Sequence, residues 1–388
     1  MERSSDDLAW LAENHARLCE IRRDFHRHPE IAFEETWTAG RLAALLRDIG
    51  CDISGPFGTT GFVATLNGGD APAVALRCDM DALPQHEDAL RDYGSQIAGR
   101  MHACGHDGHM TILIAVASLL ARGAPLAGPV HFICQPAEEV GKGAPAMLAD
   151  GLFDAIRPVR IYGYHNWPEL PLGVVSAKSG PIMAAYVKVA FKIEGRGGHA
   201  ALPHLSDDMY GAMAALITQM SAAVRRDIRG APSAFAFTQN TGGSAANIIP
   251  HALAVSASFR YSDPAHLAQI TALAEKEARA IEAAFGVRVR AQIQPVFDAT
   301  VNDVAATAHV AAQVERLASH SALLWQEAAA PSMVAEDFGA MLAQVPGCYF
   351  WLGAGMEQGA LHNSRFDFND DLLRQAPHLI AELLRQAQ

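Results

Sequence analysis

The order of strands and helices along this chain of 388 residues constrains its fold more than any other feature. From residue 1 to residue 182, apolar runs typical of buried strands alternate with stretches of helical spacing. This alternation predicts an α/β fold with a largely parallel sheet that helices cover on both faces. Strands are expected at 61–66, 73–79, 128–139 and 160–166, and helices at 8–30, 36–50, 109–123 and 144–153.

The middle of the chain follows a different order. A half-exposed alternating strand at 185–200 is followed by a helix, two strands, a long helix and a last strand, at 207–226, 233–243, 252–262, 264–286 and 287–295. This order is that of a ferredoxin-like unit, and the α/β pattern returns after it. We therefore expect a split domain, residues 1–182 and 297–388, with a smaller α+β domain inserted at 183–296.

Composition and charge narrow the classes of function. The net charge of −12, from 30 basic and 42 acidic side chains, leaves no basic surplus to neutralise nucleic-acid phosphates. No run approaches the roughly 18 apolar residues of a membrane span, and the acidic start of the chain does not resemble a secretory signal. The six cysteines have no framework spacing, so we expect reduced thiols and a cytoplasmic location.

Candidate metal ligands follow the ends of several predicted strands. In an open α/β sheet, the loops beyond the carboxyl ends of strands form the ligand crevice. Four separate segments bring thiol, imidazole and carboxylate groups to this edge, a mixed set suited to zinc, nickel, cobalt or manganese. These candidates are Cys104, His106, Glu138, Glu139, His165 and His362.

Each of these segments also has a simpler interpretation when taken alone. The Cys104–His106 pair could be structural, the two glutamates a solvated turn, and His165 a hydrogen-bonded residue at a strand end. A redox role for Cys104 is weaker, because no second cysteine is near it in the sequence. If the glutamates serve a hydrolytic site, one would bind metal and the other would act as the base. Periodicity does not decide which does which.

Longer motifs around these residues resemble the M20 metallopeptidase family. They are closest to its amidohydrolase branch of hippurate hydrolases, N-acyl-amino-acid amidohydrolases and auxin-conjugate hydrolases. The matching segments occur in order along nearly the whole chain, and as a set they are specific. They are RCDMDALP, MHACGHDGH, QPAEEVGKGAPAMLADGLF, GYHNWPELPLG, GRGGHAALPH, NIIP, EDFGAMLAQVPGCYFWLGAG and LHNSRFDFND.

The resemblance implies a zinc-peptidase-like catalytic domain with a mixed sheet flanked by helices. This domain would hydrolyse the amide bond of N-acyl amino acids with two divalent metal ions per chain. The resemblance assigns Glu138 as general base, and Asp79 and Asp81 as groups that orient ligands, because DMD stands where the wider family has histidine-x-aspartate. Cys104 takes the place of a bridging aspartate, so a bridging thiolate is expected. The metal ligands it implies are Cys104, His106, Glu139, His165 and His362.

The resemblance also implies a role for the inserted domain as lid and dimerisation domain. His199 would reach the neighbouring subunit's active site and stabilise the oxyanion there, which requires at least a homodimer. Asn247 and Arg260, thirteen positions apart, would bind the substrate's carboxylate; a structural salt bridge is the alternative for Arg260. His109 is either a neighbour of the ligands or simply packed.

Other functions remain open at this point. A dipeptidase or aminopeptidase of the same family would need an acidic group for a free amino terminus, and none is obvious. A non-catalytic binding protein would be expected to lack Glu138 or a ligand, and all are present. A regulatory metal sensor lacks the support of a basic patch or DNA-binding element. The acyl group, the amino acid and the native metal stay undetermined.

Overall fold

The computed structural model describes residues 2–88, 91–355, 357 and 359–387, and it divides into two compact units. Unit 1 comprises Met1–Ile182, Thr300–Ala329 and Asp337–Gln388, and unit 2 comprises Met183–Ala299 and Ala330–Glu336. Residues 297–299 and 330–336, which we expected in the split domain, fall in unit 2. Ala184 N donates to Ser332 O at 3.0 Å and Arg260 Nη1 donates to Met333 O at 2.9 Å, which holds residues 330–336 to that unit.

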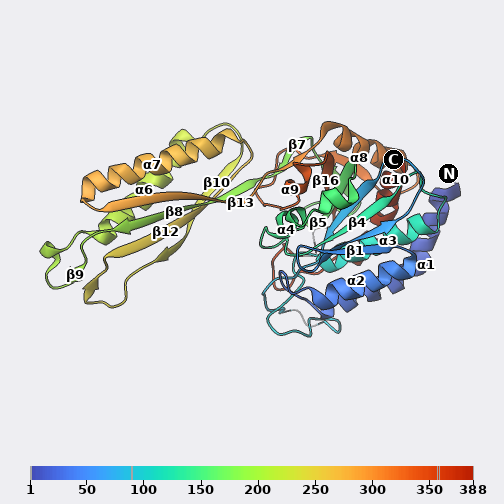
Figure 1. Ribbon diagram of the computed structural model, residues 1–388, viewed down its shortest axis with the longest axis horizontal. Coiled ribbons are helices and arrows are strands. Elements are labelled where there is room, and N and C mark those ends of the chain that lie inside the picture. Colours follow the sequence, from blue (N-terminus) through green and yellow to red (C-terminus); the bar gives the residue numbers. More distant parts are fainter. Residues whose placement is uncertain (1, 89–90, 356, 358, 388) are drawn as a thin grey trace. The chain divides into compact units, whose positions relative to one another are not determined.

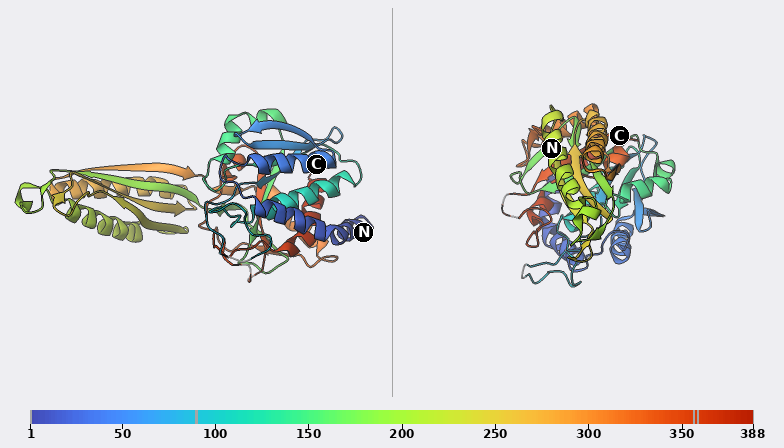
Figure 2. Two further views of the ribbon diagram at one scale, coloured as in Figure 1. Left: turned by 90° about the horizontal axis from the view of Figure 1, so that it is seen from below. Right: turned by 90° about the vertical axis from the view of Figure 1, so that its left-hand side faces the viewer.

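Unit 1 is built on a mixed sheet that has eight strands within the described residues. Its central strands are parallel and almost completely buried, which explains their continuous apolar sequences. β1 and β2 form one edge, seen in blue in Figure 2. In sheet order the strands are β1 (Asp52–Phe57), β2 (Gly61–Leu66), β4 (Val130–Gln135), β3 (Val74–Asp79), β5 (Arg160–Trp167), β16 (Gly347–Gly353), β6 (Val174–Ala177) and β15 (Leu324–Glu327).

Helices cover both faces of this sheet (Figure 1). Tyr164 of β5 donates from its hydroxyl to His109 O of α3 at 2.7 Å, whereas the adjacent Gly163 faces Phe338 at the start of α9. The helices are α1 (Glu2–Arg27), α2 (Thr36–Ile49), α3 (His106–Ala121), α4 (Gly143–Ala149), α5 (Leu152–Ile156), α8 (Val304–Leu317), α9 (Gly339–Leu342), α10 (Ala376–Gln386) and the 3₁₀ turn η2 (Asp370–Arg374). β7 (Gly180–Met183) and β14 (Thr300–Asn302) form a separate two-stranded sheet.

Unit 2 is the expected ferredoxin-like unit. Among the described residues its antiparallel sheet has four strands in the order β10-β12-β8-β13, and α6 and α7 pack together against it. Alternate residues of β8 are buried, so one face of the strand meets the helices. The elements are β8 (Ala185–Glu194), β9 (Gly198–His199), η1 (Pro203–Leu205), α6 (Met209–Asp227), β10 (Ser233–Thr241), β11 (Ile248–Ile249), β12 (Ala252–Tyr261), α7 (Ala265–Phe285) and β13 (Arg288–Phe297).

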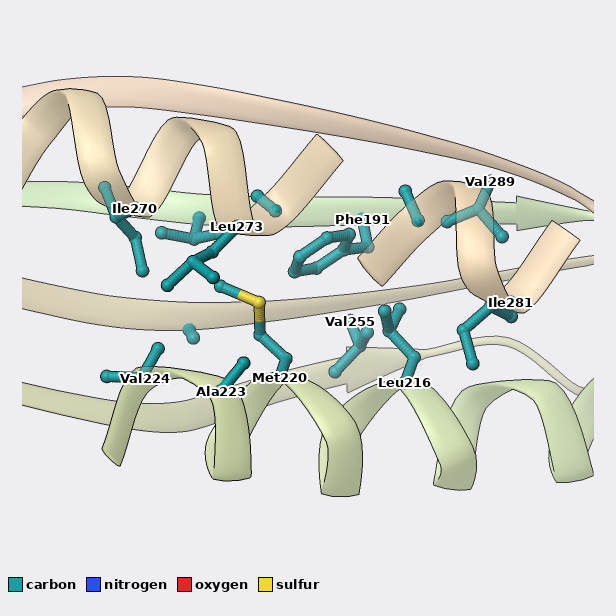
Figure 3. Close-up of a cluster of buried hydrophobic side chains, with 14 of the residues drawn as sticks. Phe191, Leu216, Met220, Ala223, Val224, Val255, Ile270, Leu273, Ile281 and Val289 are labelled. Atoms are coloured by element: carbon teal, nitrogen blue, oxygen red, sulfur yellow. The ribbon is translucent and has the colours of Figure 1, made fainter. Parts of the chain in front are cut away.

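The core of unit 2 is apolar (Figure 3). Leu216 and Met220 extend from α6 and Leu273 from α7, and the Phe191 ring of β8 lies between the two helices in this view, each residue being at most 8% exposed. Burial of this many aliphatic and aromatic side chains is the main stabilising contribution to such a unit. The predicted fold class, a mixed sheet flanked by helices with an inserted ferredoxin-like unit, is confirmed.

Two helices on either side of the ligand segments differ from the sequence expectation. The helix expected at 109–123 begins at His106, so the His106 imidazole lies in its first turn. The single helix expected at 144–153 is two helices, α4 and α5, because Gly151 between them adopts φ +81°, a left-handed conformation that glycine tolerates. None of the described helices is long and apolar enough to cross a membrane.

Candidate metal centre

The parallel strands of unit 1 deliver the candidate ligands to one edge of the sheet. Glu138 and Glu139 follow β4, and His165 lies near the end of β5. Cys104 and His106 stand at the start of α3, while His362 comes from the loop after β16, where its backbone N–H donates to Ala103 O at 2.8 Å. The convergence expected from the strand ends is therefore present in the structure.

These side chains form two groups that share Cys104. In the first, Cys104, His106 and His165 offer ligand atoms within 4.8 Å of one another, and in the second Cys104, Glu139 and His362 do the same. Cys104 Sγ is 3.3 Å from His165 Nε2, and His362 Nε2 is 3.2 Å from Glu139 Oε2. A cysteine sulfur common to two groups of three ligands is an arrangement in which one thiolate would bridge two cations.

The two buried histidines are oriented so that Nε2 points into the site. His106 Nδ1 lies 2.8 Å from Asp81 O, and His165 Nδ1 lies 2.6 Å from Asn166 O. Because a carbonyl oxygen only accepts, each Nδ1 carries the proton and donates it there, which leaves Nε2 as the available lone pair. Such an outer hydrogen bond is the usual way in which a protein fixes the tautomer of a metal-binding histidine.

Two buried ligand atoms have no hydrogen-bond partner among the described residues, and this supports a metal site. They are His106 Nε2 and Glu139 Oε1. A buried polar atom without a partner costs about 1–3 kcal/mol, so such atoms are rare in native proteins. Both atoms belong to the two ligand groups, and a bound cation would satisfy them. The donors present therefore fit two divalent cations.

Asp79 is held on both of its oxygens. Its Oδ1 is 2.6 Å from His109 Nδ1, and its Oδ2 accepts from Arg77 Nη1 at 2.7 Å. His109 Nε2 in turn lies 2.7 Å from Asn166 Oδ1. Asp79, His106 and His109 also lie within ligand distance of one another, but the existing bonds of Asp79 favour the orienting role expected for it.

Asp81 binds the backbone that carries the paired glutamates. Its Oδ1 accepts from Glu138 N at 3.0 Å and its Oδ2 accepts from Glu139 N at 3.1 Å. One carboxylate thus fixes the peptide groups of both glutamates. This contact, together with the carbonyl bond to His106, supports the expectation that Asp81 orients ligands and does not bind metal.

The charges around the site shift the pKa values of its groups in opposite directions. Burial, followed by the charges of Glu139 and Glu138, raises the pKa of the Cys104 thiol. Burial and the neighbouring His109 lower the pKa of His165. For His106, burial opposes the charged form, but Asp79 and Asp81 outweigh it and raise its pKa to about 10. The site therefore has an excess of buried negative charge that a dication would offset.

The candidate residues of unit 2 lie apart from this cluster in the chain and on a different compact unit. His199 and Asn247 are neighbours on exposed segments, since β9 pairs with β11 and Ala200 N donates to Asn247 O at 3.0 Å. Arg260 is half-buried near the far end of β12, with its guanidinium 4.9 Å from the centre of the Tyr186 ring. Ala252 and Arg260 are separated along β12 by roughly 26 Å, at 3.2–3.4 Å per strand residue.

Comparison with known proteins identifies the family to which this chain belongs. The sequence pattern of Peptidase family M20/M25/M40 matches residues 75–386. The chain belongs to this family. It is therefore a hydrolase, and the recognition made from its motifs is confirmed.

Individual relatives cover nearly the whole chain. N-acetylcysteine deacetylase of Bacillus subtilis is 33% identical over 377 residues, which are 95% of this chain and 96% of that protein. N-acetyldiaminopimelate deacetylase of Bacillus licheniformis is 34% identical over 365 residues, 92% of this chain and 95% of the relative. The crystal structure of the Bacillus subtilis YXEP protein, described as a dinuclear metal binding peptidase from the M20 family, has a TM-score of 0.84 at 29% identity and covers 97% of this chain and 98% of its own.

Proposed function

We propose that this M20 hydrolase cleaves the amide bond of N-acyl amino acids, with N-acetyl amino acids as the first candidates, and releases a carboxylic acid and a free amino acid. The observation that carries the proposal is the pair of ligand groups sharing Cys104, with Glu138 within ligand distance of His106 and Glu139. The deacetylase names of the two relatives support the acetyl group as the acyl part.

The residues that would hold the two cations are Cys104, His106, Glu139, His165 and His362. Zinc, nickel, cobalt and manganese all suit this mixture of thiolate, imidazole and carboxylate. When bound, the cations would supply Lewis acidity, which lowers the pKa of water and polarises the amide carbonyl.

Glu138 would act as general base and then as general acid. It takes a proton from the attacking water as the water oxygen bonds to the amide carbon, and it gives that proton to the amide nitrogen as the carbon–nitrogen bond breaks. Its backbone is fixed by Asp81 Oδ1, so the carboxylate needs little reorientation between the two transfers. Positioning of this kind is what lets one group serve both steps.

The exposed groups of unit 2 would complete the site from a second subunit. The partner subunit's His199 would donate a hydrogen bond to the oxygen of the tetrahedral intermediate. Because Asn247 lies beside His199 and at the other end of β12 from Arg260, one chain does not supply both Asn247 and Arg260 to one carboxylate. We therefore expect Asn247 and Arg260 of two different subunits to bind one carboxylate.

The test is amino-acid release from a panel of N-acyl amino acids that includes N-acetylcysteine, N-acetyldiaminopimelate and hippurate, with a dipeptide bearing a free amino terminus as comparison. Each substrate is assayed with added divalent metals, with chelator and with Glu138→Gln. We expect release that requires metal and falls about 10²- to 10⁴-fold in the variant. Release from the dipeptide alone, or unchanged release in Glu138→Gln, would contradict the proposal.

A further inference from the structure

The peptide that leads into the paired glutamates has an unusual conformation. Ala137, directly before Glu138, has φ +52°, in the left-handed region that alanine rarely adopts. The residue is fully buried, and its carbonyl oxygen accepts from Gly143 N at 3.1 Å. A strained backbone of this kind persists only when its surroundings hold it, and such positions cluster at functional sites.

A buried carboxylate from a distant part of the chain holds this peptide. Glu35 Oε1 accepts from Ala137 N at 2.9 Å, across 102 residues of sequence. Its other oxygen, Oε2, accepts from Thr60 Oγ1 at 2.6 Å, and the residue has no solvent exposure. Neither the motifs nor the proposed mechanism assigns Glu35 a role.

The contact is unusual for a residue at the position that Glu35 occupies in α2. Glu35 is the N-cap residue of α2, where an acidic side chain would ordinarily accept from the first free N–H groups of the helix. It makes no such capping bond; Glu30 instead accepts from Trp37 N and Thr38 N, at 3.2 and 2.8 Å. With α2 capped by Glu30, the Glu35 carboxylate turns inward to the loop after β4.

Two carboxylates therefore bind consecutive peptide groups. Glu35 accepts from the N–H of Ala137, and Asp81 accepts from the next two, those of Glu138 and Glu139. Successive N–H groups around a left-handed residue form a concavity that binds anions. Here the anions belong to the protein, and they determine the direction in which the Glu138 and Glu139 side chains leave the backbone.

We propose that Glu35 is a positioning residue, which holds the Ala137 peptide so that Glu139 is aligned to bind metal and Glu138 to act as base. Its effect on turnover rests on the function proposed above, whereas its effect on metal affinity does not. Outer hydrogen bonds of this type typically change metal affinity or activity about 10- to 100-fold.

The test compares four variants by metal affinity, measured by competition with a chelator, by melting temperature and by turnover at full metal loading. Glu35→Ala removes the acceptor, and Glu35→Asp withdraws it by one methylene while keeping the charge. Glu35→Gln keeps an amide oxygen that accepts from Ala137 N and an NH₂ that donates to Thr60. Thr60→Val is the matched control, because it removes only the Oε2 contact.

We expect metal affinity to fall about 10- to 100-fold in Glu35→Ala and Glu35→Asp and to stay at the wild-type value in Glu35→Gln and Thr60→Val. Should Glu35→Ala not fold, Glu35→Asp and Glu35→Gln make the same comparison. A lower melting temperature with unchanged metal affinity and turnover in Glu35→Asp would overturn the proposal, as would equal losses in Asp and Gln. If the wild type releases no amino acid from any N-acyl substrate while this affinity pattern holds, the proposed function fails and the Glu35 assignment stands.

Discussion

Unit 1 and unit 2 differ in the kinds of side chain that they bury. In unit 1 the least exposed side chains include charged and titratable groups such as Arg22, Arg77, Asp79 and His106, all at 0% exposure. In unit 2 the central cluster is apolar, and the candidate functional groups His199 and Asn247 are exposed. Burying charge is costly unless it is paired. The stability of unit 1 should therefore depend on metal binding at its site, whereas the stability of unit 2 should not.

The contrast is visible in single carboxyl groups. Burial raises the pKa of Glu35 to about 7, because the surroundings of this carboxyl group disfavour its charged form. Unit 2 places its ion pairs on the surface, for example Lys192 Nζ with Glu194 Oε1 at 2.7 Å. Surface pairs of this type contribute about 0–1 kcal/mol. Unit 1 thus buries charged groups of a kind that unit 2 keeps at its surface.

Removal of metal should distinguish the units most strongly. With metal at about 1,000 times its dissociation constant, ligand binding stabilises the folded state by about 4 kcal/mol. We expect chelation to abolish amino-acid release and to increase hydrogen exchange in peptides of unit 1, while peptides from α6, α7 and β8 keep their protection. Equal loss of protection in both units would show that the site does not stabilise unit 1 selectively.

A cavity in the core of unit 2 should have the opposite effect. Phe191→Ala removes a ring that is 1% exposed (Figure 3), and such a substitution costs about 3–5 kcal/mol of unfolding free energy. We expect urea denaturation and hydrogen exchange to show this loss in unit 2, with metal affinity unchanged. Lys192→Ala, at the next and exposed position of β8, is the control and should change stability by at most about 1 kcal/mol, the upper limit for its surface ion pair with Glu194. Weaker metal binding in Phe191→Ala would contradict the separation.

His199→Ala should affect activity without affecting stability. An oxyanion donor contributes about 10²- to 10³-fold to turnover, whereas an exposed side chain contributes little to folding, and the Nδ1 of His199 only accepts from Ala201 N at 3.1 Å. The control is His204→Ala, an exposed histidine of η1 five positions further along the chain.

Mixed subunits test whether His199 acts on the partner. A His199→Ala chain retains Glu138, and a Glu138→Gln chain retains His199, so a mixed dimer has one site with both groups. Mixing the two inactive proteins should restore part of the activity if His199 acts across the interface. A mixture that stays inactive, in the presence of demonstrated mixed dimers, would place His199 in its own subunit's site or outside the chemistry.

The same difference between units explains what the sequence could predict. β3, β4 and β5 were recognisable because strands buried on both faces have continuous apolar sequences, and their ends located the ligand cluster. β1 and β15 were not expected, because edge strands with exposed residues carry no apolar run. The ferredoxin-like order of unit 2 was predictable from its alternation and its long amphipathic helices.

The unpredicted part of the site depends on contacts between distant segments. Glu35 meets Ala137 across 102 residues, and no periodicity relates a helix N-cap to a loop in another part of the chain. The bonds of Asp79 to Arg77 and His109 are equally invisible in the sequence. For Asn247 and Arg260 the resemblance implies joint action, and what the sequence did not show is that the extended β12 separates the two residues within one chain.

The smallest expected effect concerns buried charges of unit 1 that lie outside the ligand groups. Arg385 Nη1 donates to Asp7 Oδ2 at 2.7 Å and joins α1 to α10. Although burial opposes the charge, the neighbouring His378 and the hydrogen bond from Arg385 lower the pKa of Asp7. Asp7→Asn should reduce the free energy of unfolding by about 1.5–3 kcal/mol at pH 7, the range for hydrogen bonds to charged groups.

The pH dependence of this loss follows from the direction of the shift. A carboxyl group whose pKa is lowered by folding stabilises the protein above its unfolded pKa, about 3.9 for aspartate, and the contribution disappears as the pH falls through the lower folded value. The difference between wild type and Asp7→Asn should therefore be full at pH 7 and shrink below about pH 4. The exposed neighbour Asp6, changed to Asn, serves as control. Because Asp7 is not among the metal ligands, chelator should leave this difference unchanged; a difference that vanished with the metal would mean that the charges of unit 1 are stabilised together and not locally.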